Sequence, residues 1–216
     1  MIIDMHMHEM RYSGDSFLRL ENMVEIAKRR GLDGICITDH DSMGLKEFAA
    51  EYSEKTGFPI FVGIEFYSLQ GDIVAFGIED YPKERIPAQE FVDLVQAQDG
   101  MCFSAHPFRN NNRGLEENLK IVKGLDGIEV LNGSTLYEAN RKAAEYAAEL
   151  GLATVGSSDC HVPEKLGIYA TYFPREIRSV QELIRSVKRC ETLPVYYRAL
   201  SVRRRGKPIV CSASKR

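Results

Sequence analysis

Short runs of apolar residues alternate along the chain with longer segments in which apolar residues recur every three or four positions. The run Gly-Ile-Cys-Ile-Thr at 34–38 is typical of a buried strand, whereas Leu20, Met23 and Ala27 have helical spacing. The pattern predicts strands at 2–3, 34–38, 59–64, 101–104, 127–131, 153–156 and 170–172, a hairpin across 66–76, and helices at 20–30, 45–56, 91–98, 115–125, 137–150 and 180–187.

Strands and helices that alternate in this way are typical of βα units arranged around a mainly parallel sheet. Six or seven such units in about 200 residues favour a small barrel over an open doubly wound sheet. No glycine-rich phosphate-binding loop follows the first strand, which argues against a dinucleotide-binding sheet. We therefore predict an α/β protein with a TIM-like (β/α) barrel in one domain, residues 1–197, followed by a basic C-terminal tail, residues 198–216.

Composition narrows the class of protein. The 216 residues are 44% hydrophobic and 27% charged, which suits a soluble globular domain, and the net charge of -3 gives no positive field for a membrane or long nucleic acid. No segment approaches the ~20 apolar residues of a membrane span, and the first residues lack the features of a signal peptide. The five cysteines are scattered without a C-x-x-C pair, which favours reduced thiols in the cytoplasm. The oligomeric state is left open.

All five histidines of the chain follow predicted strands, and three carboxylates join them as candidate metal ligands. The eight residues are His6, His8, Asp15, His40, Glu65, His106, Asp159 and His161. In a parallel barrel the C-terminal ends of the strands open onto one face, where catalytic residues gather. We therefore expect the active site at this face.

The spacing of these residues has chemical meaning. Alternate side chains of an extended strand point the same way, so His6 and His8 can bind one ion, and Asp159 and His161 repeat this spacing. Glu65 has two carboxylate oxygens and can bridge two ions. A histidine and carboxylate set without thiolates suits Mn, Zn or Fe. Eight ligands exceed the need of one tetrahedral ion, so we expect two or three divalent ions in a hydrolytic site.

Six motifs in the first three quarters of the chain resemble, in order, those of the PHP (polymerase and histidinol phosphatase) superfamily. They are Asp4-Met5-His6-Met7-His8, Ser13-Gly14-Asp15, Gly34-Ile35-Cys36-Ile37-Thr38-Asp39-His40, Gly63-Ile64-Glu65, Ala105-His106-Pro107 and Gly156-Ser157-Ser158-Asp159-Cys160-His161. The following segment, with Gly167, Tyr172 and the 180–190 helix, is also similar to the closing part of the family. The resemblance implies a distorted seven-stranded barrel with metal ions at the mouth.

The resemblance also implies how the ligands divide among three ions. The first ion would be held by His6, His8, Glu65 and Asp159, the second by Glu65 and His106, and the third by Asp15, His40 and His161. No further histidine is available for the second ion, so Asp72, Glu129 or water would complete its coordination.

Four other polar residues are candidates for supporting or substrate-binding roles. Arg109 follows His106 closely and could clamp a phosphate with its guanidinium, or be a surface arginine on a loop. Asn132, at the end of the 127–131 strand, is the second candidate substrate-binding residue. Asp39 and Glu129 are expected to orient the ligating imidazoles. Cys160 alternates with two ligands and is expected to pack in the core.

The resulting hypothesis is a metal-dependent phosphoesterase in which metal-activated hydroxide attacks phosphorus. Glu65, Asp159 and His161 are the predicted catalytic residues, and His161 or a metal-bound water would protonate the leaving group. The expected substrate is a small phosphomonoester, such as histidinol phosphate or a nucleotide bisphosphate. The alternatives are a nuclease acting on short oligonucleotides, a metal-dependent amidohydrolase and a non-catalytic metal-binding module.

Overall fold

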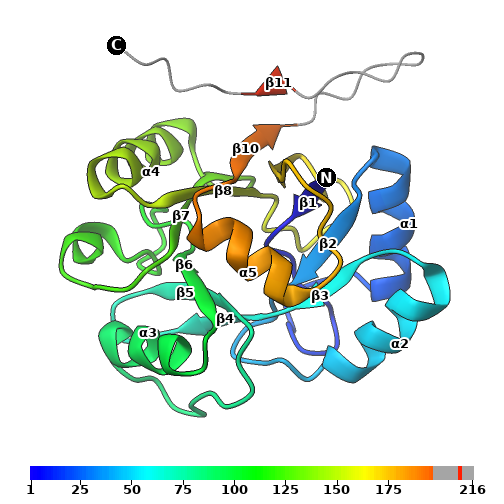
Figure 1. Cartoon of the computed structure of the whole chain (residues 1–216), viewed down its shortest axis with the longest axis horizontal. Helices are drawn as coiled ribbons and strands as arrows, with labels where there is room; N and C mark the ends of the chain where they lie inside the picture. Colours follow the sequence, from blue (N-terminus) through cyan, green and yellow to red (C-terminus); the bar gives the residue numbers. More distant parts are fainter. Residues whose placement is uncertain (197–208, 211–216) are drawn as a thin grey trace.

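The computed structural model describes residues 1–196 and the short strand at 209–210 (Figure 1). The α-helices are α1 (Leu20–Arg30), α2 (Lys46–Thr56), α3 (Ala88–Ala97), α4 (Tyr137–Leu150) and α5 (Val180–Lys188), with one 3₁₀ helix, η1 (Glu116–Lys120). The strands are β1 (Ile2–Asp4), β2 (Gly34–Ile37), β3 (Ile60–Val62), β4 (Ile64–Tyr67), β5 (Asp72–Phe76), β6 (Met101–Ser104), β7 (Gly127–Asn132), β8 (Ala153–Ser157), β9 (Tyr169–Tyr172), β10 (Leu193–Tyr196) and β11 (Ile209–Val210). The predicted basic tail falls almost entirely outside the described residues.

The strands form two mixed sheets, so the prediction of a closed seven-stranded barrel is wrong. One sheet has six strands in the order β11-β10-β9-β1-β2-β3, and the other has five in the order β4-β5-β6-β7-β8. Strands β1 to β3 are parallel, as are β6 to β8, but β5 is antiparallel to both its neighbours and β9 is antiparallel to β1.

Gly63 marks the break between the two sheets. It alone separates β3 from β4, and these two strands pair in different sheets. A Cβ atom at this position would lie 2.4 Å from the backbone oxygen of Ala75, so only glycine allows so close an approach of the two chain segments. Apolar periodicity could not reveal this break, because 59–64 is one uninterrupted apolar run.

The two sheets meet where β1, β2 and β8 end. Isolated parallel bridges join Met7 to Cys160 and His40 to Glu65, each linking one sheet to the other. Because β5 runs antiparallel to β4 and β6, its first residue, Asp72, lies at this same edge. The junction therefore collects the C-terminal ends of the parallel strands and the beginning of β5.

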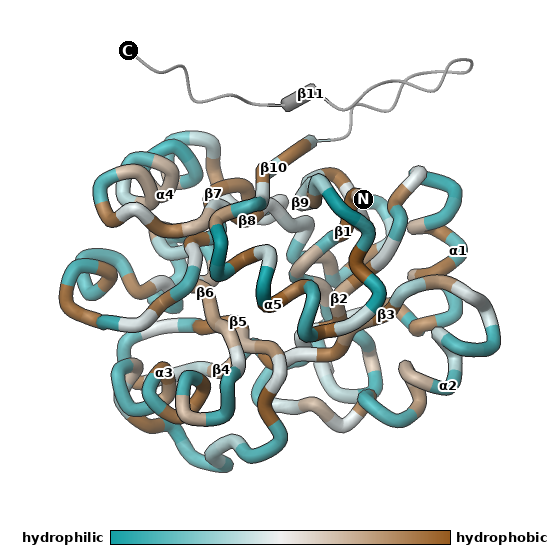
Figure 2. The backbone as a smooth tube through the Cα atoms, viewed as in Figure 1, coloured by the Kyte–Doolittle hydropathy of each residue, from teal (hydrophilic) through white to brown (hydrophobic). Residues whose placement is uncertain are grey.

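The helices cover the sheets with one apolar face each. Helix α1 buries Leu20, Met23, Val24 and Ala27, and it ends at Gly31, whose φ of 76° is left-handed. In Figure 2 hydrophilic and hydrophobic residues alternate along α1, α3 and α4, which is the pattern of helices with one side in solvent. Among the described helices, none is long and apolar enough to span a membrane.

The predicted helix at 115–125 is wrong in type and length. Only Glu116–Lys120 is helical, and it is a 3₁₀ helix. Leu119 is its buried residue, and the buried residues Val122 and Leu125 lie beyond its end in segments without helical structure.

Candidate metal centre

The structure brings all eight predicted ligands to the junction between the two sheets. Their ligand atoms fall into overlapping groups that lie within 4.8 Å of one another: His6, His8 and Glu65; His6, His106 and Asp159; His8, His40 and His161; and Glu65, Asp72 and His106. His6, His8, Glu65 and His106 each belong to two of these groups, so the groups form one continuous cluster, and Asp15 adjoins it beside His40 and His161.

His6 and His8, in the segment that follows β1, face each other, as side-chain alternation along an extended segment predicts. The Nε2 atoms of His6 and His8 are 3.0 Å apart. Glu65 Oε1 lies 3.3 Å from Nε2 of His6, and Asp159 Oδ1 lies 3.2 Å from Nε2 of His8. The intervening Met7 points into the core. Four converging donors of nitrogen and carboxylate type are a set that a divalent cation can use.

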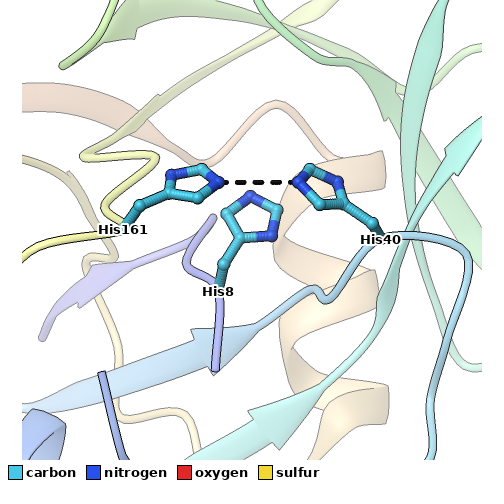
Figure 3. A group of neighbouring side chains, drawn as sticks. All are labelled: His8, His40 and His161. Atoms are coloured by element: carbon cyan, nitrogen blue, oxygen red, sulfur yellow. Dashed lines mark hydrogen bonds between the residues drawn. The ribbon is translucent and has the colours of Figure 1, made fainter. Parts of the chain in front are cut away.

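His8, His40 and His161 form the outer part of the cluster, and Figure 3 shows their rings pointing toward one another. The Nε2 atoms of His40 and His161 are 3.5 Å apart. Asp15 Oδ2 lies 3.4 Å from Nε2 of His40 and 3.3 Å from Nε2 of His161. The Asp15 side chain is 61% exposed, so this group opens toward solvent.

Glu65, Asp72 and His106 form the inner group on the side of the five-stranded sheet. His106 Nε2 lies 2.9 Å from Glu65 Oε1 and 3.7 Å from Asp72 Oδ2. The Nε and Nη2 atoms of Arg113 donate to the two Asp72 oxygens at 2.7 and 2.8 Å. Of the two carboxylates that the sequence offered to complete this group, Asp72 has an oxygen in it, and Arg113 is an additional residue that the sequence did not single out.

The buried carboxylates of the cluster stabilise positive charge on the groups next to them. Burial by itself would lower the pKa of His6, but Glu65, Asp159 and Glu129 together raise the pKa well above its usual value. Burial would likewise raise the pKa of Glu65 and of Asp159, yet the field of His6 and hydrogen bonds from neighbouring histidines hold both pKa values low.

The pKa of His8 is shifted in the opposite direction to that of His6. Burial lowers its pKa to about 4, so its imidazole is neutral near pH 7 and its ring nitrogen is available as a ligand. The buried Nδ1 atom of His106 has no hydrogen-bond partner among the described residues, whereas Nδ1 of His40 lies 2.7 Å from Oε2 of Glu65. Ionised carboxylates, the neutral imidazole of His8 and the unpartnered ring nitrogen of His106 in one buried place make a donor set that fits divalent metal ions.

Glu129 lies directly behind the ligands. Its Oε1 is 3.2 Å from Nδ1 of His6, and its Oε2 accepts hydrogen bonds from the backbone N–H of His106 at 2.7 Å and from Nδ2 of Asn132 at 2.9 Å. One carboxylate thus contacts the ring of one predicted ligand and the backbone of another. A carboxylate in this position fixes the tautomer and orientation of a ligating imidazole.

Replacing Glu129 by glutamine is expected to weaken metal binding without removing a ligand. The amide cannot accept all the hydrogen bonds that the carboxylate accepts, so His6 loses its fixed tautomer, and metal affinity should fall by about 10- to 100-fold. Metal titration followed by calorimetry measures this change, with Glu138→Gln on the surface of α4 as the matched control. An unchanged affinity would show that Glu129 does not orient the cluster.

Asp39 acts on the cluster through Ser13, a residue that the sequence indicated only as part of the motif Ser13-Gly14-Asp15. Its Oδ1 accepts hydrogen bonds from the hydroxyl of Ser13 at 2.8 Å and from the backbone N–H of Glu9 at 2.6 Å. The Ser13 oxygen lies 3.2 Å from Nδ1 of His8 and also accepts from the backbone N–H of His40. Asp39 therefore contacts the imidazole of His8 indirectly, by way of Ser13.

Two of the predicted ligands have left-handed backbone. The φ angles of His106 and Asp159 are 27° and 47°, a region that costs a residue other than glycine about 1–3 kcal/mol. The backbone N–H of Asp159 donates to the carbonyl of His6 at 2.9 Å, and that of His106 is held by Glu129. These hydrogen bonds hold the chain in the conformation that aims both side chains at the cluster.

The two predicted substrate-binding residues lie side by side next to Asp159. Arg109 donates to Asp159 Oδ2 and, at 2.8 Å, to Asn132 Oδ1, while its Nε donates to Thr135 at 3.2 Å. Asn132 is fully buried, and its Nδ2 also lies 3.1 Å from Asp159 Oδ2. Arg109 is 19% exposed, so it reaches solvent and Asn132 does not. Binding of substrate by either residue stays a prediction.

Comparisons with known proteins find similarity to a PHP-associated family over part of the chain. A family model described as PHP-associated (PHP_C) matches residues 137–192. The uncharacterized protein MJ1587 of Methanocaldococcus jannaschii is 27% identical over 140 residues, which cover 60% of this chain and 80% of that protein.

Solved structures of low sequence identity share the fold. A protein from Bifidobacterium adolescentis described as a metal-dependent phosphoesterase has a TM-score of 0.63 at 19% identity, covering 74% of this chain and 88% of that one. An amidohydrolase from Chromobacterium violaceum has a TM-score of 0.66 at 20% identity, covering 86% and 96%. Endonuclease Q from Pyrococcus furiosus has a TM-score of 0.69 at 18% identity. The match covers 87% of this chain but only 55% of the endonuclease chain.

Proposed function

We infer that this chain, which belongs to the PHP superfamily, is a metal-dependent hydrolase that cleaves phosphoesters. The observation that carries this proposal is the continuous cluster of histidine and carboxylate donors in which Glu65, with two carboxylate oxygens, is shared by two groups. Shared ligands keep neighbouring ions close together, as hydrolases with more than one metal ion require. The relatives of similar fold include a phosphoesterase, an amidohydrolase and an endonuclease, all of which are hydrolases.

We propose that the overlapping donor groups together hold two or three divalent ions of Mn, Zn or Fe. His6, His8, Glu65 and Asp159 would hold the first, Glu65, Asp72 and His106 the second, and Asp15, His40 and His161 the third. Bound ions would supply water activated near neutral pH and would neutralise the charge of the phosphate.

The protein itself contributes groups for binding and proton transfer. The partly exposed guanidinium of Arg109 can donate two hydrogen bonds to the non-bridging oxygens of a phosphate. His161 is 24% exposed and lies at the solvent side of the cluster, where it can give a proton to the leaving alkoxide. Glu65 and Asp159 are the proposed catalytic carboxylates, because they touch the imidazoles of the cluster directly.

The reaction class is tested by measuring metal content and substrate range on one purified sample. We expect one to three Mn, Zn or Fe ions per chain, release of phosphate from a small phosphomonoester, and little turnover of amides or oligonucleotides. Preferred cleavage of short oligonucleotides would favour a nuclease, and preferred cleavage of amides an amidohydrolase. A sample that binds no metal and stays inactive after Mn or Zn is added would contradict the proposal.

A further inference from the structure

The guanidinium of Arg113 binds both carboxylate oxygens of Asp72, a residue of the inner donor group. Nε of Arg113 donates to Oδ2 at 2.7 Å, and Nη2 donates to Oδ1 at 2.8 Å. The side chain of Asp72 is 1% exposed and that of Arg113 is 31% exposed, so the pair is largely shielded from water. A bidentate pair in such a place fixes the geometry of both groups and balances their charges.

The backbone and an aromatic ring also hold Arg113 in this position. The backbone N–H of Asp72 donates to the carbonyl of Arg113 at 2.7 Å, and the backbone N–H of Arg113 donates to the side-chain oxygen of Asn111 at 3.1 Å. Cζ of Arg113 lies 4.3 Å from the centroid of the Tyr67 ring. These contacts keep a positive charge beside the inner donor group.

The inner donor group, formed by Glu65, Asp72 and His106, has little negative charge left for a divalent ion of its own. Arg113 balances the charge of Asp72. Oε1 of Glu65 lies 2.9 Å from Nε2 of His106 but also 3.3 Å from Nε2 of His6, so the first proposed ion would share this carboxylate. A ligating imidazole is neutral and adds no negative charge.

Asp159 is also paired with an arginine, but one of its oxygens still faces the cluster. Arg109 donates to Oδ2 of Asp159, whereas Oδ1 lies 3.2 Å from Nε2 of His8. At Asp72 the arginine contacts both oxygens. Each carboxylate oxygen has a second lone-pair direction, so this contact weakens the binding of a cation by Asp72 without excluding it.

We propose that Arg113 is a fixed cation that weakens the second metal position, so that the chain holds two divalent ions firmly and one weakly. This rests on the proposed function, because the ions are those of the proposed hydrolytic centre. An ion bound by Asp72 would share that carboxylate with the guanidinium, and the two positive charges repel each other.

The opposite role for Arg113 would be to orient Asp72 as a metal ligand, as the hydrogen-bond partners of ligating carboxylates commonly do. The two roles predict changes of opposite sign. Removing a repelling cation tightens the binding of the weak ion, whereas removing an orienting partner loosens it.

Titration of Mn²⁺ into the metal-free protein by calorimetry distinguishes the two roles without depending on turnover. We expect the wild-type protein to bind two Mn²⁺ ions at least about 10-fold more tightly than the weak ion. Arg113→Met removes the charge and adds a thioether that is a poor ligand for Mn²⁺, so the weak ion should bind at least about 10-fold more tightly. Arg113→Lys keeps the charge and should keep the weak ion weak.

Thermal unfolding provides a second readout. Metal-free Arg113→Met should unfold at a lower temperature than the wild-type protein, because Asp72 loses its partner while it stays buried. Saturating Mn²⁺ should then raise the unfolding temperature of this variant by more than that of the wild-type protein. If Arg113→Met does not fold, Arg113→Gln serves as the uncharged variant, because its amide can still donate to Asp72.

Arg85→Met is the matched control. Cζ of Arg85 lies 3.5 Å from the centroid of the same Tyr67 ring, but Arg85 has no ion pair with Asp72 in the described part of the chain, so this variant should bind Mn²⁺ as the wild-type protein does. Equally tight ions in the wild-type protein, an unchanged or weaker ion in the uncharged variant, or a tightened ion in Arg113→Lys would overturn the inference alone. A wild-type protein that binds neither Mn²⁺ nor Zn²⁺ would contradict the proposed function as well.

Discussion

Replacing His8 by alanine is expected to abolish the release of phosphate, with a loss of about 1000-fold or more in kcat/KM. His8 is fully buried and its ring belongs to two donor groups, one with His6 and Glu65 and one with His40 and His161. Removing its imidazole therefore takes a ligand from the first proposed ion and also removes the ring that packs against His40 and His161. Metal analysis should show the loss of at least one ion per chain along with the activity.

Loss of activity in His8→Ala through misfolding has to be distinguished from loss of activity through the missing metal ligand. All five histidines of the chain belong to the cluster, so no histidine outside it can serve as a control. Circular dichroism and the unfolding temperature of the metal-free proteins provide the comparison instead. Wild-type activity in the variant when metals are supplied would refute the assignment of the metal centre.

The position of the cluster could be predicted because its strongest signals are local. His6 and His8 lie on the same side of an extended segment whichever sheet the segment joins, since side-chain alternation is a property of the strand itself. Residues that follow parallel strands also meet at one edge whether or not the strands close into a barrel. The wrong prediction of a closed barrel therefore did not misplace the eight candidate ligands.

Asp72 and Arg113 show what the sequence could not decide. Asp72 is the first residue of a strand rather than a residue that follows one. It lies at the cluster because β5 runs antiparallel to β4, as the predicted hairpin implies, and also to β6, which the sequence pattern did not predict. Arg113 reaches Asp72 because its loop crosses the β4–β5 turn, where the Arg113 carbonyl accepts a hydrogen bond from the backbone N–H of Asp72 at 2.7 Å. Neither strand direction nor the path of a loop is encoded in hydrophobic periodicity.

Replacing Glu65 by glutamine should cause a loss of activity as large as that from removing His8, although the change is nearly isosteric. Its Oε1 lies 3.3 Å from Nε2 of His6 and 2.9 Å from Nε2 of His106, and its Oε2 lies 2.7 Å from Nδ1 of His40. Glutamine keeps one oxygen but turns the other position into an N–H donor, which cannot bind a cation. It also removes the buried negative charge that offsets bound metal ions.

The expected result is a fall in kcat/KM of about 1000-fold or more, together with a lower metal content. Glu117→Gln is the matched control, because Glu117 is 65% exposed and contacts Lys142 on the surface. The comparison with Glu129→Gln, which keeps every ligand, then separates direct ligation from orientation of the ligands. If Glu65→Gln lost no more activity than Glu129→Gln, Glu65 would not be a shared ligand, and the continuity of the cluster would have no role in the chemistry.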